Sequence, residues 1–138
     1  MGVLSVISFL VTALFTFVFI MAGTVKVSPL VDPAIHEEMK QNFQEKWAPI
    51  FGLEELQEEF RVGLGATEII CALLLWTPLS TLSNLVLMVI MGGAVYSHVT
   101  VDDPQEKIMA PAILGAGLFV LFVLNMASGS SKQKSKTA

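Results

Sequence analysis

Apolar residues gather in four long runs along the chain, and polar stretches separate these runs. The runs cover about residues 3–25, 62–79, 82–99 and 108–127. Each is close to the roughly 20 residues that a helix needs to cross the hydrocarbon core of a membrane, although the second and third are short. The pattern predicts an all-α protein in which residues 1–127 form one domain, a four-helix transmembrane bundle.

The longest polar stretch, residues 27–60, has the pattern of an amphipathic loop between the first two spans. Asp32 followed by Pro33 is typical of the start of a helix. Apolar residues then recur at every fourth position: Ile35, Met39, Phe43 and Trp47. One apolar face on a charged helix favours a segment that lies on the membrane surface or covers one end of the bundle. We expect this helix to end at Pro49 and a second amphipathic piece, residues 53–60, to lead into the second span.

The four apolar runs contain a single charged residue, Glu68. A charge near the middle of a membrane costs about 2.5–3.5 kcal/mol on insertion scales, so such residues usually face a protein interior or a cavity. Glu68 is therefore either a neutral carboxyl group packed between helices or the partner of a cation.

The predicted topology gathers polar residues near one face of the membrane. Four spans place both termini on one side, and the polar connections 27–60 and 100–107 on the other. The residues expected to meet there in a buried polar cluster are Lys26, Arg61, Glu68, His98 and Asp103, with Asp102 beside them. Lys26 either extends to the membrane surface, as lysines at helix ends commonly do, or pairs with Glu68, with His98 as a further neighbour.

Composition narrows the chemistry. The chain is 54% hydrophobic and only 14% charged, which is typical of a membrane protein. The single cysteine, Cys71, excludes a disulfide framework and a CxxC pair, and nothing in the sequence indicates a nucleic acid partner. Glu68 and His98 are the candidate acid-base groups, without a nucleophile motif or a metal-ligand cluster, and His36 and His98 are far apart in sequence. We therefore expect no catalysis, no cofactor and no metal site.

The C-terminal tail, residues 128–138, is short and rich in lysine. It ends Lys-Ser-Lys-Thr-Ala, with Lys134 and Lys136 at the fifth and third positions from the end. This ending is similar to the dilysine signal by which coat machinery retrieves membrane proteins to the endoplasmic reticulum. Because such a signal works only on a cytosolic tail, it predicts an endoplasmic reticulum protein with both termini cytosolic and the loop 27–60 in the lumen.

Three segments together resemble the nicotinic acetylcholine receptor chaperone family, a branch of the DoxX-like four-helix membrane proteins. They are AGTVKV at 22–27, FRVGLGATEIICALL at 60–74 and HVTVDDP at 98–104, and the resemblance covers about residues 15–125. It implies a non-catalytic chaperone of the endoplasmic reticulum that promotes folding, assembly and surface expression of pentameric nicotinic receptor subunits. By position it also implies roles for the polar cluster and for Cys71.

A chaperone of this kind needs surfaces that bind its clients. The apolar face of the loop, with Trp47 and Phe51 near it, is the predicted contact with a client's extracellular domain, and small-residue faces of the helices are the predicted contacts with client helices. Membrane lipid is the expected surrounding.

The alternative function from another class is a small oligomeric proton-coupled transporter that uses Glu68. Client identity, the client-binding helix face and a homo-oligomeric state stay open.

Overall fold

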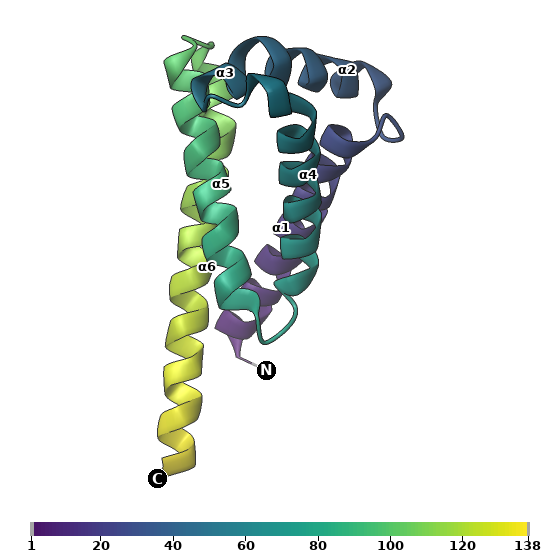
Figure 1. The fold of residues 1–138 in the computed structure, drawn as a ribbon. Helices are drawn as coiled ribbons and strands as arrows, with labels where there is room; N and C mark the ends of the chain where they lie inside the picture. Colours follow the sequence, from purple (N-terminus) through teal and green to yellow (C-terminus); the bar gives the residue numbers. More distant parts are fainter. Residues whose placement is uncertain (1, 138) are drawn as a thin grey trace.

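The computed structural model describes residues 2–137, with side chains as far as residue 129, and its regular structure is helical (Figure 1). No strand occurs among these described residues. The long helices are α1 (Val3–Val27), α4 (Gln57–Leu74), α5 (Ser80–Thr100) and α6 (Gln105–Thr137). Between α1 and α4 lie four short elements: α2 (Pro33–Asn42), the π-helical turn η1 (Phe43–Trp47), α3 (Ala48–Ile50) and the 3₁₀ turn η2 (Glu54–Leu56).

The long helices pack as two pairs. α1 lies along α4 and α5 lies along α6, while contacts between the pairs are fewer. In Figure 1 the pairs are close together near the N-terminus and farther apart at the other end, where residues 33–50 cross over them. We call residues 33–50 the cap. The hydrophobic core lies between the pairs, and it is formed by Phe15, Phe19, Cys71, Ala72, Leu75, Leu87, Met91, Leu118 and Leu121.

Three of the long helices have the length and composition to cross a membrane: residues 3–27, 80–100 and 105–129. Their outward faces carry many exposed large apolar side chains, as expected of helices that contact lipid. α4 is long enough but too polar to be counted with them, because its first turns contain the charged residues Glu58, Glu59 and Arg61. The chain is thus an all-α membrane protein with three candidate spans.

The cap begins where the sequence predicted and ends one residue beyond the predicted end. The Asp32 side chain accepts hydrogen bonds from the N–H groups of Ala34 and Ile35, at 3.0 and 3.1 Å. The helical path ends at Ile50, one residue beyond the predicted end at Pro49, which is within the usual uncertainty of a helix end. The turn before Pro49 is widened, with the Ala48 N–H bonded to the carbonyl five residues back. A wider turn relieves the clash that a proline ring makes in a regular helix.

The second long helix starts and ends earlier than its apolar run. The amphipathic piece before it continues directly into α4, which therefore begins at Gln57. α4 ends at Leu74, and residues 75–79 form the turn to α5. Pro78 accounts for this, because its ring would clash with the carbonyl four residues earlier, that of Leu74, and it has no N–H to donate to that carbonyl. α4 and α5 form an antiparallel hairpin across this turn (Figure 1).

Candidate functional site

Two segments of the same pattern form the crossing of α1 and α4. In each, a glycine is followed three residues later by a charged residue: Gly23 and Lys26 on α1, Gly65 and Glu68 on α4. A Cβ atom on Gly23 would lie 2.5 Å from the Gly65 carbonyl oxygen, and one on Gly65 would lie 2.7 Å from the Gly23 carbonyl oxygen. Only glycine permits this approach. Because residues three apart share a helix face, the glycine contact brings Lys26 to Glu68.

The predicted contact between Lys26 and Glu68 is present. Lys26 Nζ lies 2.9 Å from Glu68 Oε2 and also donates to the Ala22 carbonyl at 3.3 Å. The Glu68 side chain is only 1% exposed, so Lys26 turns inward rather than to the membrane surface. A buried pair gains little net stability, because desolvation offsets the attraction, but removing one partner leaves the other charge unpaired at high cost.

Two further basic side chains donate hydrogen bonds to backbone carbonyls at the C-terminal end of α1. The last carbonyls of a helix have no partner within it. Arg61 Nη1 donates to the Lys26 carbonyl, and His36 Nδ1 donates to the Val25 carbonyl at 2.7 Å. Arg61 and His36 are both buried, and a positive charge at this end also interacts favourably with the helix dipole. His36, weighed from the sequence only as a metal ligand, thus ties the cap to α1.

A second group of polar side chains, separate from Lys26 and Glu68, lies at the C-terminal end of α5. The Asp103 N–H bonds to the His98 carbonyl at 3.0 Å and the Asp102 N–H to the Val99 carbonyl at 3.2 Å, with Asp102 at φ 53°. This is the Schellman arrangement that ends many helices. It returns the Asp103 carboxylate to His98, with 2.7 Å between Oδ2 and Nδ1, and Lys46 Nζ from the cap lies 3.5 Å from Oδ1.

The protonation of this group follows from its contacts. Burial alone would raise the pKa of Asp103, but the hydrogen bond from His98 and the charge of Lys46 outweigh burial and hold that pKa below its ordinary value. An ionised carboxylate only accepts hydrogen bonds, so the hydrogen lies on Nδ1 of His98. In a neutral imidazole the other nitrogen, Nε2, is then an acceptor.

The predicted polar cluster is therefore two groups, one on each helix pair. Lys26, Glu68 and Arg61 belong to the α1–α4 pair, and His98 and Asp103 to the end of α5. Topology placed all five at one end of the bundle, but it could not show that the pairs separate there.

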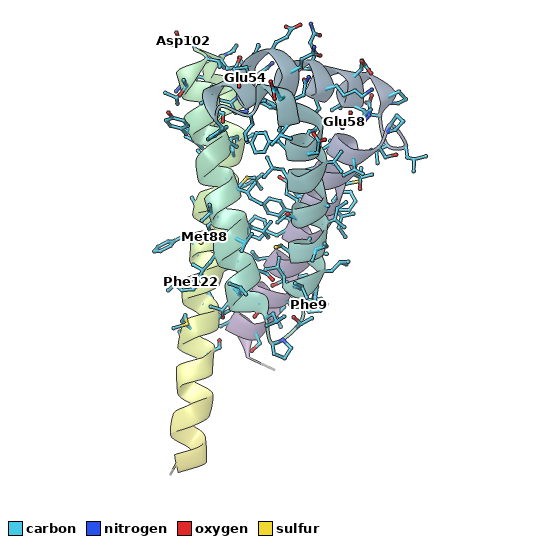
Figure 2. All side chains as sticks on the ribbon, viewed as in Figure 1. Phe9, Glu54, Glu58, Met88, Asp102 and Phe122 are labelled. Carbon is cyan, nitrogen blue, oxygen red and sulfur yellow. The ribbon has the colours of Figure 1, made fainter. Side chains whose placement is uncertain are left out.

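A cavity of about 580 Å³ lies between the two helix pairs, below the cap. Figure 2 shows side chains from both pairs directed into this region. Most of its lining is apolar or aromatic, and its polar side chains are Lys26, Glu38, Asn42, Glu68, Ser97, His98 and Lys107. Among the residues with described side chains, no group of three or more His, Cys, Asp or Glu is placed to hold a metal ion.

The two predicted client-contact residues have different surroundings. Trp47 is only 9% exposed and lines the cavity. Its ring packs edge-on against Phe43, with ring centres 4.9 Å apart, and against His98, at 5.3 Å. The ring thus faces the interior of this chain, and its contact with a client stays a prediction. Phe51, at 42% exposed, is accessible at the surface.

Sequence reasoning missed two polar residues. Lys46, which belongs to the charged face of the amphipathic segment, reaches Asp103. Asn84 is completely buried on α5, and neither side-chain amide atom has a hydrogen-bond partner among the described residues. Like Glu68, Asn84 lies inside an apolar run, and this position in the sequence could have identified it as a buried polar residue. The predicted retrieval residues Lys134 and Lys136 lie outside the residues with described side chains.

A sequence profile of the DoxX-like family matches residues 10–123, a range that contains both polar groups and the whole cap. No curated protein matches the chain.

Proposed function

The chain belongs to the DoxX-like family of membrane proteins, and on this premise we propose that it is a non-catalytic chaperone of the endoplasmic reticulum membrane. Its proposed clients are nicotinic acetylcholine receptor subunits, whose folding, assembly and surface expression it assists. The resemblance of residues 22–27, 60–74 and 98–104 to the receptor chaperones supports this client. In the structure those segments contain the α1–α4 crossing and the Schellman turn, which hold the two polar groups.

The observation that carries the proposal is an exposed, mostly apolar face of α5. It consists of Leu85, Val89, Gly92, Tyr96 and Val99, which recur every three or four residues and are all exposed. A Cβ atom on Gly92 would meet nothing within 4 Å, whereas Gly23 and Gly65 are closed by their mutual contact. A glycine within an apolar face lets a second helix approach closely. We propose that a transmembrane helix of the client packs on this face, and that Phe51 contacts the client's extracellular domain.

The proposal includes a four-span topology with cytosolic termini and a lumenal cap. α4 would cross beside α1, with its charged first turns at the level of the cap. In Figure 1 the start of α1 and the later part of α6 lie at the end opposite the cap, as four spans require. The lysine-rich tail supports a cytosolic position for that end.

An engineered glycosylation site is expected to report a lumenal cap. Gly52 follows α3, is exposed and has φ 67°, a conformation that asparagine tolerates better than most residues. Gly52→Asn together with Glu54→Thr creates an Asn-x-Thr acceptor. We expect a mass increase in microsomes that endoglycosidase H removes, and none for Gly52→Asn alone. Modification of an acceptor fused after Ala138, without modification of the cap, would contradict the topology.

Surface receptor levels test the function and the α5 face together. Cells that express a homomeric nicotinic subunit are expected to bind several-fold more labelled ligand at the surface when this protein is present. Gly92→Leu should cut that gain by about five-fold, because forcing a larger side chain into a close helix contact costs about 1–3 kcal/mol. Gly92→Ala, which has open space around it, is the matched control and should keep most of the gain.

Two outcomes would contradict these proposals. An equal gain with Gly92→Leu and wild type, at equal expression, would remove the α5 face from the account. No gain with any subunit tested would reject the client, and proton-driven transport through Glu68 would become the function to measure.

A further inference from the structure

The cavity below the cap is bounded by all four long helices, and the protein does not fill it. One apolar lining residue on each helix is only half-buried: Ala22 on α1, Leu64 on α4, Ile90 on α5 and Leu114 on α6. Gly93 lies three residues after Ile90, on the same face of α5, and a Cβ atom on it would meet nothing within 4 Å. A space of about 580 Å³ is therefore left between these side chains.

The cavity reaches the outer surface of the protein at the level of the membrane interior. Val89 lines the cavity and is nevertheless 75% exposed, so the cavity is open to the surroundings there. Val89 lies at the middle of α5 (Ser80–Thr100), which is a candidate membrane span. At the middle of a span the surrounding medium is the hydrocarbon core of the membrane. The molecules that meet this opening are therefore lipid chains.

The charges in the wall are already used within the chain. Each ionisable side chain that lines the cavity contacts an ionisable partner, and the contacts are Lys26 with Glu68 at 2.9 Å, Lys107 with Glu38 at 3.5 Å, and His98 with Asp103 at 2.7 Å. A phosphate, carboxylate or ammonium group that entered this space would lose its hydration without gaining an unpaired counter-charge. The wall therefore favours an uncharged, apolar occupant.

A lipid chain is a better filling for this space than water or vacuum. Water enters a cavity readily only where polar groups can bind it, and an apolar cavity stays dry. An empty cavity deprives the atoms of its wall of dispersion contacts. A lipid chain that moves from the bilayer to an apolar wall exchanges one apolar environment for another. Its entry thus restores the missing contacts, and the volume of the space is usual for a small-molecule site.

We propose that this cavity holds an acyl chain of a membrane phospholipid. The chain enters beside Val89 and lies along Leu64, Ile90 and Leu114, while its charged headgroup stays at the membrane surface. The bound chain takes part in the packing between the two helix pairs, which are farther apart toward the cap than near the N-terminus (Figure 1). The site does not depend on the proposed client, because every residue involved belongs to this chain.

Photolabelling tests the site on purified full-length protein in phosphatidylcholine nanodiscs, without receptor. The probe is a phosphatidylcholine with a diazirine in the middle of one acyl chain, and mass spectrometry locates the labelled residues. We expect labels on Leu64, Ile90 and Leu114 as well as on the outward-facing Phe119 and Val120, each 55% exposed. A phosphatidylcholine with the diazirine on its headgroup should label none of the three cavity residues, because no charged group is expected to enter.

Two glycine variants distinguish a chain inside the cavity from chains outside the protein. Gly93→Leu places a side chain in the open space of the cavity. It should reduce the labelling of Leu64 and Leu114 about five-fold, because the leucine takes volume that the lipid chain needs, and it should leave the label on Phe119 unchanged. Gly63→Leu is the matched control, since Gly63 also has nothing within 4 Å but does not line the cavity. It should be labelled like the wild type.

Three results would overturn the proposal. The first is a wild-type protein without acyl-chain label on Leu64, Ile90 and Leu114, and the second is labelling of these residues by the headgroup probe. The third is a folded Gly93→Leu variant that is labelled at these residues as strongly as the wild type, because the label would then come from outside the cavity. The first two results come from the wild type, so they stand even if Gly93→Leu does not fold.

Discussion

The Lys26→Met variant is expected to be destabilised by about 3 kcal/mol, the cost of breaking a buried ion pair from one side. Glu68 is 1% exposed, and Lys26 Nζ is its only hydrogen-bond partner in the described part of the chain. Methionine keeps much of the apolar stem of lysine but removes the charge. For a protein of this size, such a loss corresponds to a fall of about 10 °C in the midpoint of thermal unfolding in detergent.

Substituting Glu68 and substituting Lys26 should lower the stability of the protein by different amounts. After Glu68→Gln, Lys26 Nζ keeps the Ala22 carbonyl at 3.3 Å and is 15% exposed, so its charge retains a partner and some solvent. Glu68→Gln should therefore cost less than Lys26→Met. The double variant Lys26→Met with Glu68→Leu should recover most of the stability, because an apolar pair can replace a buried ion pair without loss.

Lys40→Met is the matched control. Lys40 is paired with Glu37 at 3.6 Å on the exposed surface of the cap, and surface pairs contribute about 0–1 kcal/mol. Its melting midpoint should stay near that of the wild type. A Lys26→Met variant as stable as Lys40→Met would show that the Lys26–Glu68 contact does not hold α1 and α4 together. Receptor surface binding by the double variant then separates folding from function, since it tests whether a stable bundle needs the charges.

The pattern of apolar residues predicted where the helices lie, because it shows which residues are kept away from water. The first and third runs match α1 and α5 within two residues at each end. The same pattern misplaced the end of α4, since Leu75 and Leu79 are apolar whether they belong to a helix or to the turn before α5. It also could not decide which long helices contact lipid, because a helix sheltered between neighbours can carry charges such as Arg61 that an exposed span would exclude.

The pairing of Lys26 with Glu68 was predictable from topology, whereas the cavity was not. A lone carboxylate in an apolar run restricts its partners to the few cations that the same topology brings near. The role of Trp47 depends on how the cap is rotated about its axis. Phe43 and Trp47 face inward, whereas Ile35 is exposed and its neighbour His36 is buried, so the apolar period of four residues does not give the rotation of the cap.

The Gly65→Ala variant should lose stability although alanine is the better helix former. Its new methyl group would lie 2.7 Å from the Gly23 carbonyl oxygen, 2.8 Å from Val27 Cγ2 and 2.9 Å from Lys26 Cβ. The first of these is backbone, so α1 and α4 must move apart. Overpacking of this kind costs about 1–3 kcal/mol, which exceeds the gain of about 1 kcal/mol that alanine brings to a helix. Gly63→Ala, on the open side of α4 with nothing within 4 Å, should be neutral or stabilising.

The crossing glycines and the ion pair should also be coupled, because both depend on the same distance between α1 and α4. If Gly65→Ala already pulls Lys26 from Glu68, adding Lys26→Met removes a contact that has been weakened. The double variant should then lose less stability than the sum of the single losses, by about 0.5–3 kcal/mol. Thermal unfolding of the four proteins in one detergent measures this difference directly. Strict additivity would mean that the glycines set the packing of the helices but not the position of the charges.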